Sequence, residues 1–306
     1  MSFCIPDFTV GLGYRHRAVT VFPLFLSRPA ADVDYAFAAD ALARGRAHVE
    51  EVDRRGEVGR IRVVNGEEKS ILFLEGEQLL GAKQNRIVNT TTLVPAKSQA
   101  SLPVSCVERG RWSDHGPRFD VSSCMAPAGL RRVVKASVTR SVITRAGFVA
   151  DQEGVWRCIA RGEQRLDARS PTQALQDLFQ TNQQQLNGYT AALGYVERAA
   201  GVAMGVGPRV VSIDLFDKPS TCRRFWERLL VGTALDALQS SDQLGSVDTR
   251  EVHGLVAAAC SSRWVKTNAA GLGDEFRSRE TDMVAASALA LNGTFIHVTI
   301  AQGGVA

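Results

Sequence analysis

The chain has 306 residues, of which 45% are hydrophobic and 22% are charged, and its formal net charge is +4 at pH 7. This is the profile of an ordinary globular protein with enough apolar material for a sizeable core, so composition excludes a disordered chain. No stretch reaches the roughly 20 apolar residues that a membrane-spanning helix needs, so we expect no membrane association.

The first apolar segment, Val19–Leu26, imitates a signal peptide because Arg15-His16-Arg17 precedes it. The segment is short, contains Pro23 and lacks a small-residue cleavage site after it, so we interpret it as the first core strand. The six cysteines are scattered and we recognise no secretory signal, which favours free thiols. We therefore expect a cytoplasmic protein.

Strands are expected through most of the first 160 residues. Short runs of apolar residues, separated by residues typical of turns, predict them. A single helix, Asp32–Arg44, is indicated by its alanine content, with Gly45 at its end. The expected strands that follow are Ala47–Val52, Gly59–Val64, Ser70–Leu74, Arg86–Val94, Ala100–Val107, Val133–Ile143 and Gly154–Ala160.

The second half mixes helices with closing strands. Ser170-Pro171-Thr172-Gln173 has the form of a capping box, which predicts a helix start, and apolar residues then recur at helical spacing as far as Tyr189. A second helix is expected from Asp217 to Gln239. Asn292-Gly293 is typical of a hairpin turn. The expected strands are Val202–Met204, Arg209–Phe216, Glu275–Arg279, Met283–Leu291 and Thr294–Ile300.

Runs of strands broken by a few helices favour an α+β fold over a doubly wound parallel sheet. We predict a β-rich fold of mostly antiparallel strands, sandwich- or barrel-like, with three or so helices. A boundary near Asp167–Ser170 would separate a β-rich part, residues 1–167, from an α+β part, residues 168–306. The alternative is one compact domain in which both halves share a core.

Basic side chains gather between Arg109 and Arg145, where eight basic and two acidic residues give a net charge of +6. Such a field attracts anions such as phosphates, and a solvated face is the alternative. Few aromatic residues interleave and the total charge is small, so nucleic acid is not an expected partner. The cysteines form no C-x-x-C pair and the histidines show no H-x-x-x-H spacing, so we predict no structural metal.

Polar side chains crowd between apolar strands from Leu74 to Trp112, and such groups are costly beside buried strands unless they are paired. In extended backbone, Glu75 and Glu77 would lie on one side, ~7 Å apart at ~3.3 Å per residue. Two close carboxylates can split their pKa values, so that one acts as acid and the other as base. A divalent cation between them, or pairing with a nearby lysine or arginine, are the alternatives.

Two cations and two amides follow within four residues, Lys83 to Arg86. Lysine and arginine suit phosphate, and the amides of Gln84 and Asn85 suit sugar hydroxyls. Cys106 would share a strand face with Glu108. It could act as a nucleophile only with a depressed pKa, and a buried free cysteine is the alternative.

The segment ends in Arg109-Gly110-Arg111-Trp112, an Arg–Trp cluster that suits a planar or phosphorylated ligand. An arginine stacked on a structural tryptophan is the alternative.

The run EGEQLLGAKQNRIVNTTTLVP, followed by PVSCVERGRW, resembles the signature of an uncharacterised bacterial family. That family is named for its genomic association with ADP-ribosylglycohydrolases and rhodanese/phosphatase-type proteins. The likeness extends in weaker form from about Val19 to Ile300. It implies a setting in NAD or ADP-ribose metabolism, and it supplies no reaction and no catalytic residue.

Together these observations lead us to expect a site for an anionic phosphorylated small molecule, a nucleotide or an ADP-ribose-like compound. The reaction would be hydrolysis or group transfer, with no cofactor beyond the divalent cation considered above. The catalytic candidates are Glu75, Glu77 and Cys106. The ligand-binding candidates are Lys83, Gln84, Asn85, Arg86, Asn89, Glu108, Arg109 and Trp112.

Two other readings stay open. The first is a binding or regulatory module without catalysis, which explains the same residues as a recognition surface. The second is structural, with the polar groups forming an internal hydrogen-bonded network that fixes strand register. A homo-oligomer is compatible with all three.

Overall fold

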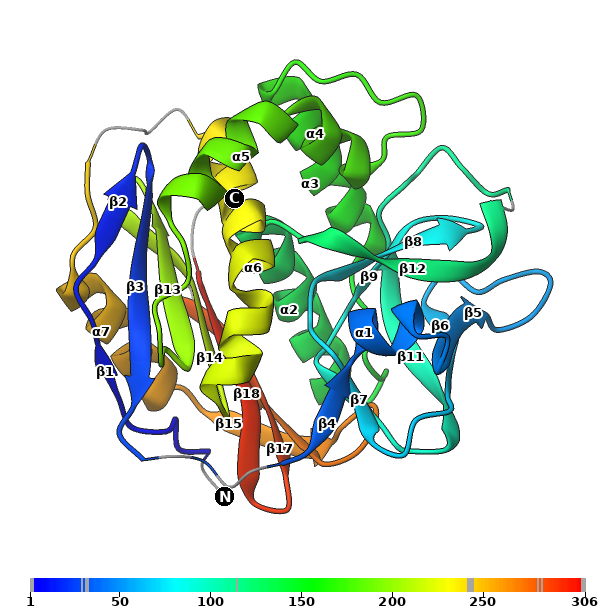
Figure 1. Ribbon diagram of the computed structural model, residues 1–306, viewed down its shortest axis with the longest axis horizontal. Helices are drawn as coiled ribbons and strands as arrows, with labels where there is room; N and C mark the ends of the chain where they lie inside the picture. The colour runs from blue at the N-terminus through cyan, green and yellow to red at the C-terminus, as the bar shows by residue number, and fades with distance from the viewer. Residues whose placement is uncertain are drawn as a thin grey trace.

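The computed structural model describes residues 3–28, 30, 33–113, 115–240, 245–279, 281 and 283–303. Its strands form three sheets, two of which dominate the molecule (Figure 1). A nine-stranded sheet and a closed six-stranded barrel lie on either side of the helices α2 (Ala128–Ile143) and α6 (Pro219–Gln239).

The nine-stranded sheet is antiparallel throughout, in the order β1-β3-β13-β14-β18-β17-β16-β15, with β2 paired to β3. Because side chains alternate across each strand, its two faces differ. One face packs apolar side chains such as Ile213 and Val298 against α7 (Thr249–Ser261). The strands are β1 (Phe8–Val10), β2 (Tyr14–His16), β3 (Val19–Leu26), β13 (Gly201–Val206), β14 (Arg209–Phe216), β15 (Trp264–Asn268), β16 (Asp274–Ser278), β17 (Val284–Leu291) and β18 (Thr294–Gln302).

The barrel closes in the order β11-β6-β5-β12-β8-β9, and apolar side chains such as Val63, Leu79 and Phe119 fill it. A small sheet, β10-β7-β4, lies beside it. The barrel strands are β5 (Ala47–Glu51), β6 (Arg60–Asn65), β8 (Glu77–Ala82), β9 (Arg86–Val88), β11 (Ser98–Cys106) and β12 (His115–Met125). The small sheet has β4 (Tyr35–Phe37), β7 (Ser70–Phe73) and β10 (Thr92–Val94).

The described residues contain seven helices, so the prediction of three or so was wrong. Val133–Ile143 and Gly154–Ala160, expected as strands, lie in α2 and in α3 (Gln152–Arg165). The helical period of α2 was hidden because it buries Arg131 and Lys135 together with its apolar residues, which leaves no purely apolar stripe. The remaining helices are α1 (Ala38–Ala43), α4 (Leu175–Thr181) and α5 (Gln183–Ala192).

Two helix starts were also placed too early. The segment 32–44 contains the strand β4 before the six residues of α1. The Ser170 hydroxyl accepts a hydrogen bond from the Ala174 amide, but Gln173 has a φ of 52° and α4 begins only at Leu175. A positive φ cannot belong to a right-handed helix, so this serine caps a turn that precedes the helix.

The β-rich, mostly antiparallel fold with a barrel is confirmed. The expected helix from 217 to 239 is α6, the expected strands 202–204 and 209–216 lie in β13 and β14, and the expected hairpin at Asn292-Gly293 joins β17 to β18. Asn292 and Gly293 have φ values of 52° and 81°, as a two-residue hairpin turn requires. The nine-stranded sheet takes β1 to β3 from before residue 167 and β13 to β18 from after it, so the two expected parts share this sheet.

All six cysteines are free. Within the described residues, no helix is both long and apolar enough to cross a membrane. The same residues contain no group of three histidine, cysteine or acidic side chains placed to hold a metal ion.

The close approach of β8 to β12 gives a first prediction. Gly81 has a φ of +123°, and an added Cβ would lie 2.6 Å from the Arg118 carbonyl oxygen. Gly116 also has a positive φ, +90°, but its added Cβ would meet nothing within 4 Å. Each alanine substitution adds backbone strain of about 1–3 kcal/mol. We expect Gly81→Ala to lower the free energy of unfolding in urea clearly more than Gly116→Ala does. Equal losses would contradict the close approach.

Candidate functional site

The Glu75 side chain lies in the protein interior, where it pairs with Lys135 of α2. Its Oε1 accepts a hydrogen bond from Lys135 Nζ at 2.5 Å, and its Oε2 accepts one from the Ser287 hydroxyl at 3.2 Å. Burial lowers the pKa of Lys135 to about 8, although the charge of Glu75 opposes that shift. Burial alone would raise the pKa of Glu75, but Lys135 and Arg131 lower it below its ordinary value.

Asp214 of β14 forms the second part of the same network. Its carboxylate accepts hydrogen bonds from Arg131 Nη1 at 3.0 Å and Nη2 at 2.5 Å. His297 Nε2 lies 3.1 Å from Asp214 Oδ1, and His297 Nδ1 lies 2.9 Å from the Thr91 hydroxyl. Burial would raise the pKa of Asp214, but Arg131 and His297 hold it well below its usual range. Burial keeps the pKa of His297 below its ordinary value.

Arg277 and Glu275 of β16 complete the buried network. Arg277 Nε donates to Glu275 Oε1 at 2.6 Å, and Arg277 Nη2 donates to the Thr90 hydroxyl at 2.9 Å. Burial raises the pKa of Glu275. The network thus contains three acidic and three basic side chains, all buried. None of these residues lines any of four cavities of the described surface.

Glu77 turns away from this network, although Glu75 is only two residues distant. Its Oε2 accepts a hydrogen bond from the Leu74 amide, and its Oε1 meets Arg228 Nη1 of α6 at 2.5 Å. The backbone between the two carboxylates is not extended, because Gly76 has a φ of +86°. The two carboxylates therefore do not converge on one site.

Arg86 forms a separate cluster at one end of the barrel. Its fully buried guanidinium donates to Gln84 Oε1 at 3.1 Å and to the Cys106 sulfur. The ring of Trp112 lies 5.4 Å from its Cζ, and Glu51 Oε1 lies 3.5 Å from Nη2. We call these residues the barrel-end cluster.

Cys106 is the nucleophile candidate of this cluster. Burial raises the pKa of its thiol to about 11, although Arg86 opposes the shift. A thiol with that pKa is protonated at neutral pH and is a poor nucleophile.

The other predicted ligand-binding residues contact the protein itself. Glu108 binds Arg111 Nη2 at 2.6 Å and the Asn85 amide at 3.2 Å, and burial would raise its pKa were it not for these hydrogen bonds, which lower it. Asn89 bonds to the Ser105 hydroxyl and to the carbonyl of Phe148. Arg109 is exposed and lies over the ring of Trp156 at 5.1 Å.

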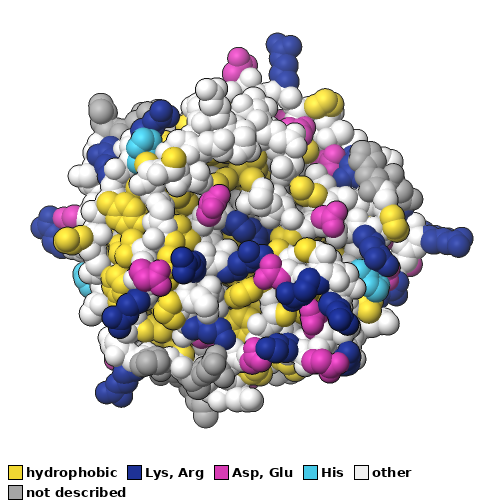
Figure 2. Space-filling view, in the orientation of Figure 1, with side chains coloured by type: hydrophobic (Ala, Val, Ile, Leu, Met, Phe, Trp, Pro, Cys, Tyr) yellow, Lys and Arg dark blue, Asp and Glu magenta, His cyan; other side chains and the backbone are white. Residues whose placement is uncertain are grey.

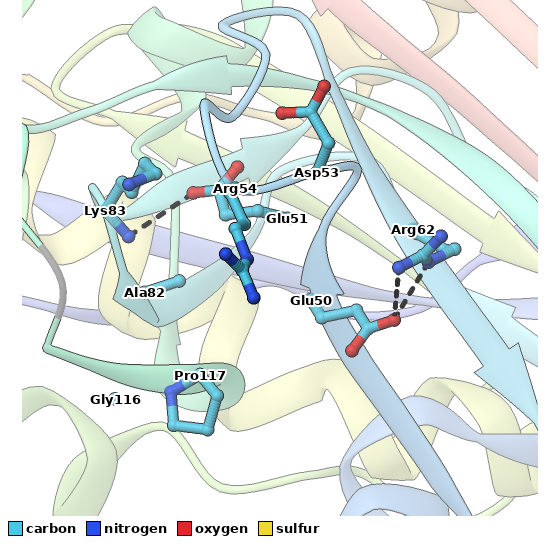
Figure 3. A pocket seen from close by; sticks show the side chains of 9 residues that line it. All are labelled: Glu50, Glu51, Asp53, Arg54, Arg62, Ala82, Lys83, Gly116 and Pro117. Atoms are coloured by element: carbon cyan, nitrogen blue, oxygen red, sulfur yellow. Dashed lines mark hydrogen bonds and ion pairs between the residues drawn. The ribbon is translucent and has the colours of Figure 1, made fainter.

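A cavity of about 720 Å³ opens beside the barrel-end cluster (Figure 3). We call it the barrel-end cavity. Lys83 is the predicted site residue that lines it, and Figure 3 shows Arg54 between Lys83 and the Glu50–Arg62 ion pair. Its lining residues are Glu50, Glu51, Asp53, Arg54, Arg62, Ala82, Lys83, Gly116 and Pro117.

Glu51 joins the cavity to the barrel-end cluster. Its Oε1 accepts a hydrogen bond from the Lys83 amide at 3.3 Å. Its Oε2 is buried and meets no hydrogen-bond donor among the described residues. An added Cβ on Gly56 would meet the side chains of Lys83, Glu51 and Trp112 at 2.9, 3.2 and 3.3 Å, so these three converge at one point of the loop.

The sequence contained a signal for Glu51 that we missed. In Ala47–Glu51 the inward positions alternate, and Ala47 and Val49 fill the barrel. Glu51 takes the next inward position. Because side chains alternate along a strand, the sequence itself indicates a carboxylate at the end of this buried face. The composition of the charged residues that follow, Arg54 among them, predicts a turn and gives no sign of a binding role.

The likeness to known proteins covers nearly the whole chain. The family model described as the ARG and Rhodanese-Phosphatase-superfamily-associated Protein domain matches residues 7–301, which include the barrel-end cavity and the buried network. Comparison with curated proteins and with solved structures finds no match.

The buried network generates a second prediction. Lys135→Met leaves the Glu75 carboxylate uncompensated in the interior, and breaking a buried pair in this way costs about 3–5 kcal/mol of unfolding free energy. The double variant Glu75→Gln with Lys135→Met leaves no unpaired charge and should recover a large part of that loss. Arg132→Met, on the same helix but half-buried, is the control and should cost less than 1 kcal/mol. Urea unfolding of all four proteins measures this, and a double variant no more stable than Lys135→Met would refute the pairing.

Proposed function

The chain belongs to the family of ARG and Rhodanese-Phosphatase-superfamily-associated Protein domains, and from that membership and the barrel-end cavity we propose that it binds a phosphorylated small molecule with sugar hydroxyls. A nucleotide or an ADP-ribose-like compound has this chemistry. The volume of about 720 Å³ lies within the range of small-molecule sites, which is about 300–1,000 Å³.

The unpartnered Oε2 of Glu51 is the observation that carries the proposal. A buried acceptor without a donor is costly, so a ligand hydroxyl that reaches it gains more than the same hydrogen bond would give in water. Carboxylates are the usual partners of ribose hydroxyls in nucleotide sites. Arg86 supports this role because it keeps a cation 3.5 Å from the same carboxylate.

Phosphate recognition falls to Lys83 and Arg54, which line the cavity. Lysine offers a point charge and arginine a planar fork, and both suit a phosphate group. Trp112 is 46% exposed and converges with Lys83 and Glu51 at Gly56, so the exposed part of its ring suits a stacked base.

Hydrolysis or group transfer would need an acid–base group that reaches this cavity. Glu75 and Glu77 are engaged in ion pairs with Lys135 and Arg228 and do not line it. In a catalytic version, the carboxylates of the cavity wall would take that role. The protonated thiol of Cys106 favours the second candidate function, a binding or regulatory module without catalysis.

A binding series tests the proposal. ADP-ribose, AMP and ribose 5-phosphate should raise the melting temperature of the protein, because a ligand of the native state stabilises it. Glu51→Gln and Lys83→Ala should each weaken binding about tenfold, which corresponds to about 1.4 kcal/mol. Lys97→Ala, at a lysine in the turn between β10 and β11 that pairs with Glu68 and does not line the cavity, is the matched control.

The outcome that ends the proposal is a set of identical dissociation constants for wild type, Glu51→Gln and Lys83→Ala, or no stabilisation by any of the three compounds. Product analysis of the same mixtures separates the two candidate functions, because a binding module returns its ligand unchanged.

A further inference from the structure

A second cavity, of about 640 Å³, lies where α6 meets β12 and the β4–α1 junction. We call it the arginine cleft. Figure 2 shows Lys and Arg side chains gathered near the middle of the face that carries α6, with acidic side chains among them. The cleft is lined by Phe37, Ala39, Val121, Ser122, Ser123, Ser220, Arg223, Arg224, Glu227 and Arg228.

The pattern of α6 explains why its arginines gather here. Phe225, Trp226, Leu229 and Leu230 are buried in the core below the helix. Residues 220, 223, 224, 227 and 228 lie on the other side of a 3.6-residue period, so they share one outer face above β12. The positive end of the helix dipole adds to the field on this side, because the cleft includes Ser220 in the first turn.

All three arginines of the cleft are paired with carboxylates, Arg228 with Glu77. Arg224 pairs with Asp40, and Arg223 lies 3.6 Å from Glu197 and over the ring of Tyr195. Net charge therefore does not define the cleft, and its selectivity has to come from the geometry of its donors.

Arg228 supplies that geometry. Its side chain is only 13% exposed, its Nη1 is bound to Glu77, and its Cζ lies 5.5 Å from the centre of the Phe225 ring. Its Nε and Nη2 are buried, and no acceptor among the described residues reaches either of them. These two N–H groups form one edge of the guanidinium, the edge that binds two oxygens of one anion.

Buried donors without acceptors are rare in native proteins, since each forfeits the hydrogen bonds it made in water. The other arginines with an orphaned buried atom, such as Arg86 and Arg131, leave only Nε unpaired. Arg228 leaves a whole edge unpaired, in a residue that lines a cavity with three serine hydroxyls.

We propose that the arginine cleft is a binding site for a phosphate group, held by the free edge of Arg228 and by the hydroxyls of Ser123 and Ser220. The hydroxyl of Ser122 donates to Gln176 and only lines the wall. Glu77 is a positioning residue of this site, because its ion pair holds the guanidinium with that edge unpaired. The site is separate from the barrel-end cavity and does not depend on it: the two share no lining residue.

Titration of the whole protein with inorganic phosphate, glycerol 3-phosphate and acetate, followed by calorimetry, tests the proposal. Phosphate or its monoester should bind saturably and acetate much more weakly. Arg228→Lys keeps the charge but loses the two-donor edge, and it should weaken binding at least tenfold. Arg157→Lys, an ion-paired arginine of α3 that does not line the cleft, is the matched control and should change binding less than twofold. Tighter binding of glycerol 3-phosphate than of phosphate identifies an esterified ligand, and the reverse identifies the free anion.

A second variant covers the case in which Arg228→Lys fails to fold. Ser123→Asp places a carboxylate on the cleft wall, where it should occupy the Arg228 edge, abolish phosphate binding and raise the melting temperature in phosphate-free buffer. Ser101→Asp, an exposed serine on β11, controls for the added charge.

Equal phosphate affinities in wild type, Arg228→Lys and Ser123→Asp would overturn the proposal, as would the absence of saturable binding in the wild type. Loss of phosphate binding in Lys83→Ala but not in Arg228→Lys would assign the anion to the barrel-end cavity and would likewise reject the arginine cleft.

Discussion

The buried ion pair between Glu75 and Lys135 lies where the start of the barrel strand β8, α2 and the nine-stranded sheet meet. Charges at this depth are tolerable only when each has a partner and further hydrogen bonds. The sheet meets that demand through its alternation, because Asp214, Ser287 and Thr299 point toward α2 while their neighbours face α7. The polar face of the sheet is thus buried inside the protein, where Arg131 and Lys135 of α2 donate hydrogen bonds to it.

The buried network explains how the segment from Glu75 to Lys83 contributes to several parts of the molecule. Glu75 anchors it in the network, and the turn at Gly76 then starts β8, which carries Glu77 to α6 and leads on to Lys83 at the barrel-end cavity. Of the alternatives raised by the sequence, the internal network describes Glu75 and its partners. Recognition chemistry is left to the side chains that reach the two cavities, and the proposals for both begin from atoms that the protein leaves unpaired.

Much of the fold was readable from the sequence, because β-strands, α6 and the hairpin at Asn292 obey simple periodicities. The helix α2 was not, because its inner face is charged and the neutralising carboxylates are distant in the chain: Glu75 lies 60 residues from Lys135, and Asp214 lies 83 residues from Arg131. Dependence on the folded backbone also limits how much of the candidate site could be predicted from the sequence. The polar groups that crowd residues 74–112 could be read from the sequence. The divergence of Glu75 and Glu77 depends on one positive φ at Gly76, and the inward position of Glu51 depends on barrel closure.

The partners in the buried network are far apart along the chain: 60 residues separate Glu75 from Lys135, and 212 separate Glu75 from Ser287. Until β14 to β18 have been synthesised, Arg131 and Lys135 have too few acceptors to leave water, so α2 cannot settle in its final place. Such long loops are slow to close. We therefore expect the packing of α2 against the sheet to await the synthesis of the last hundred residues.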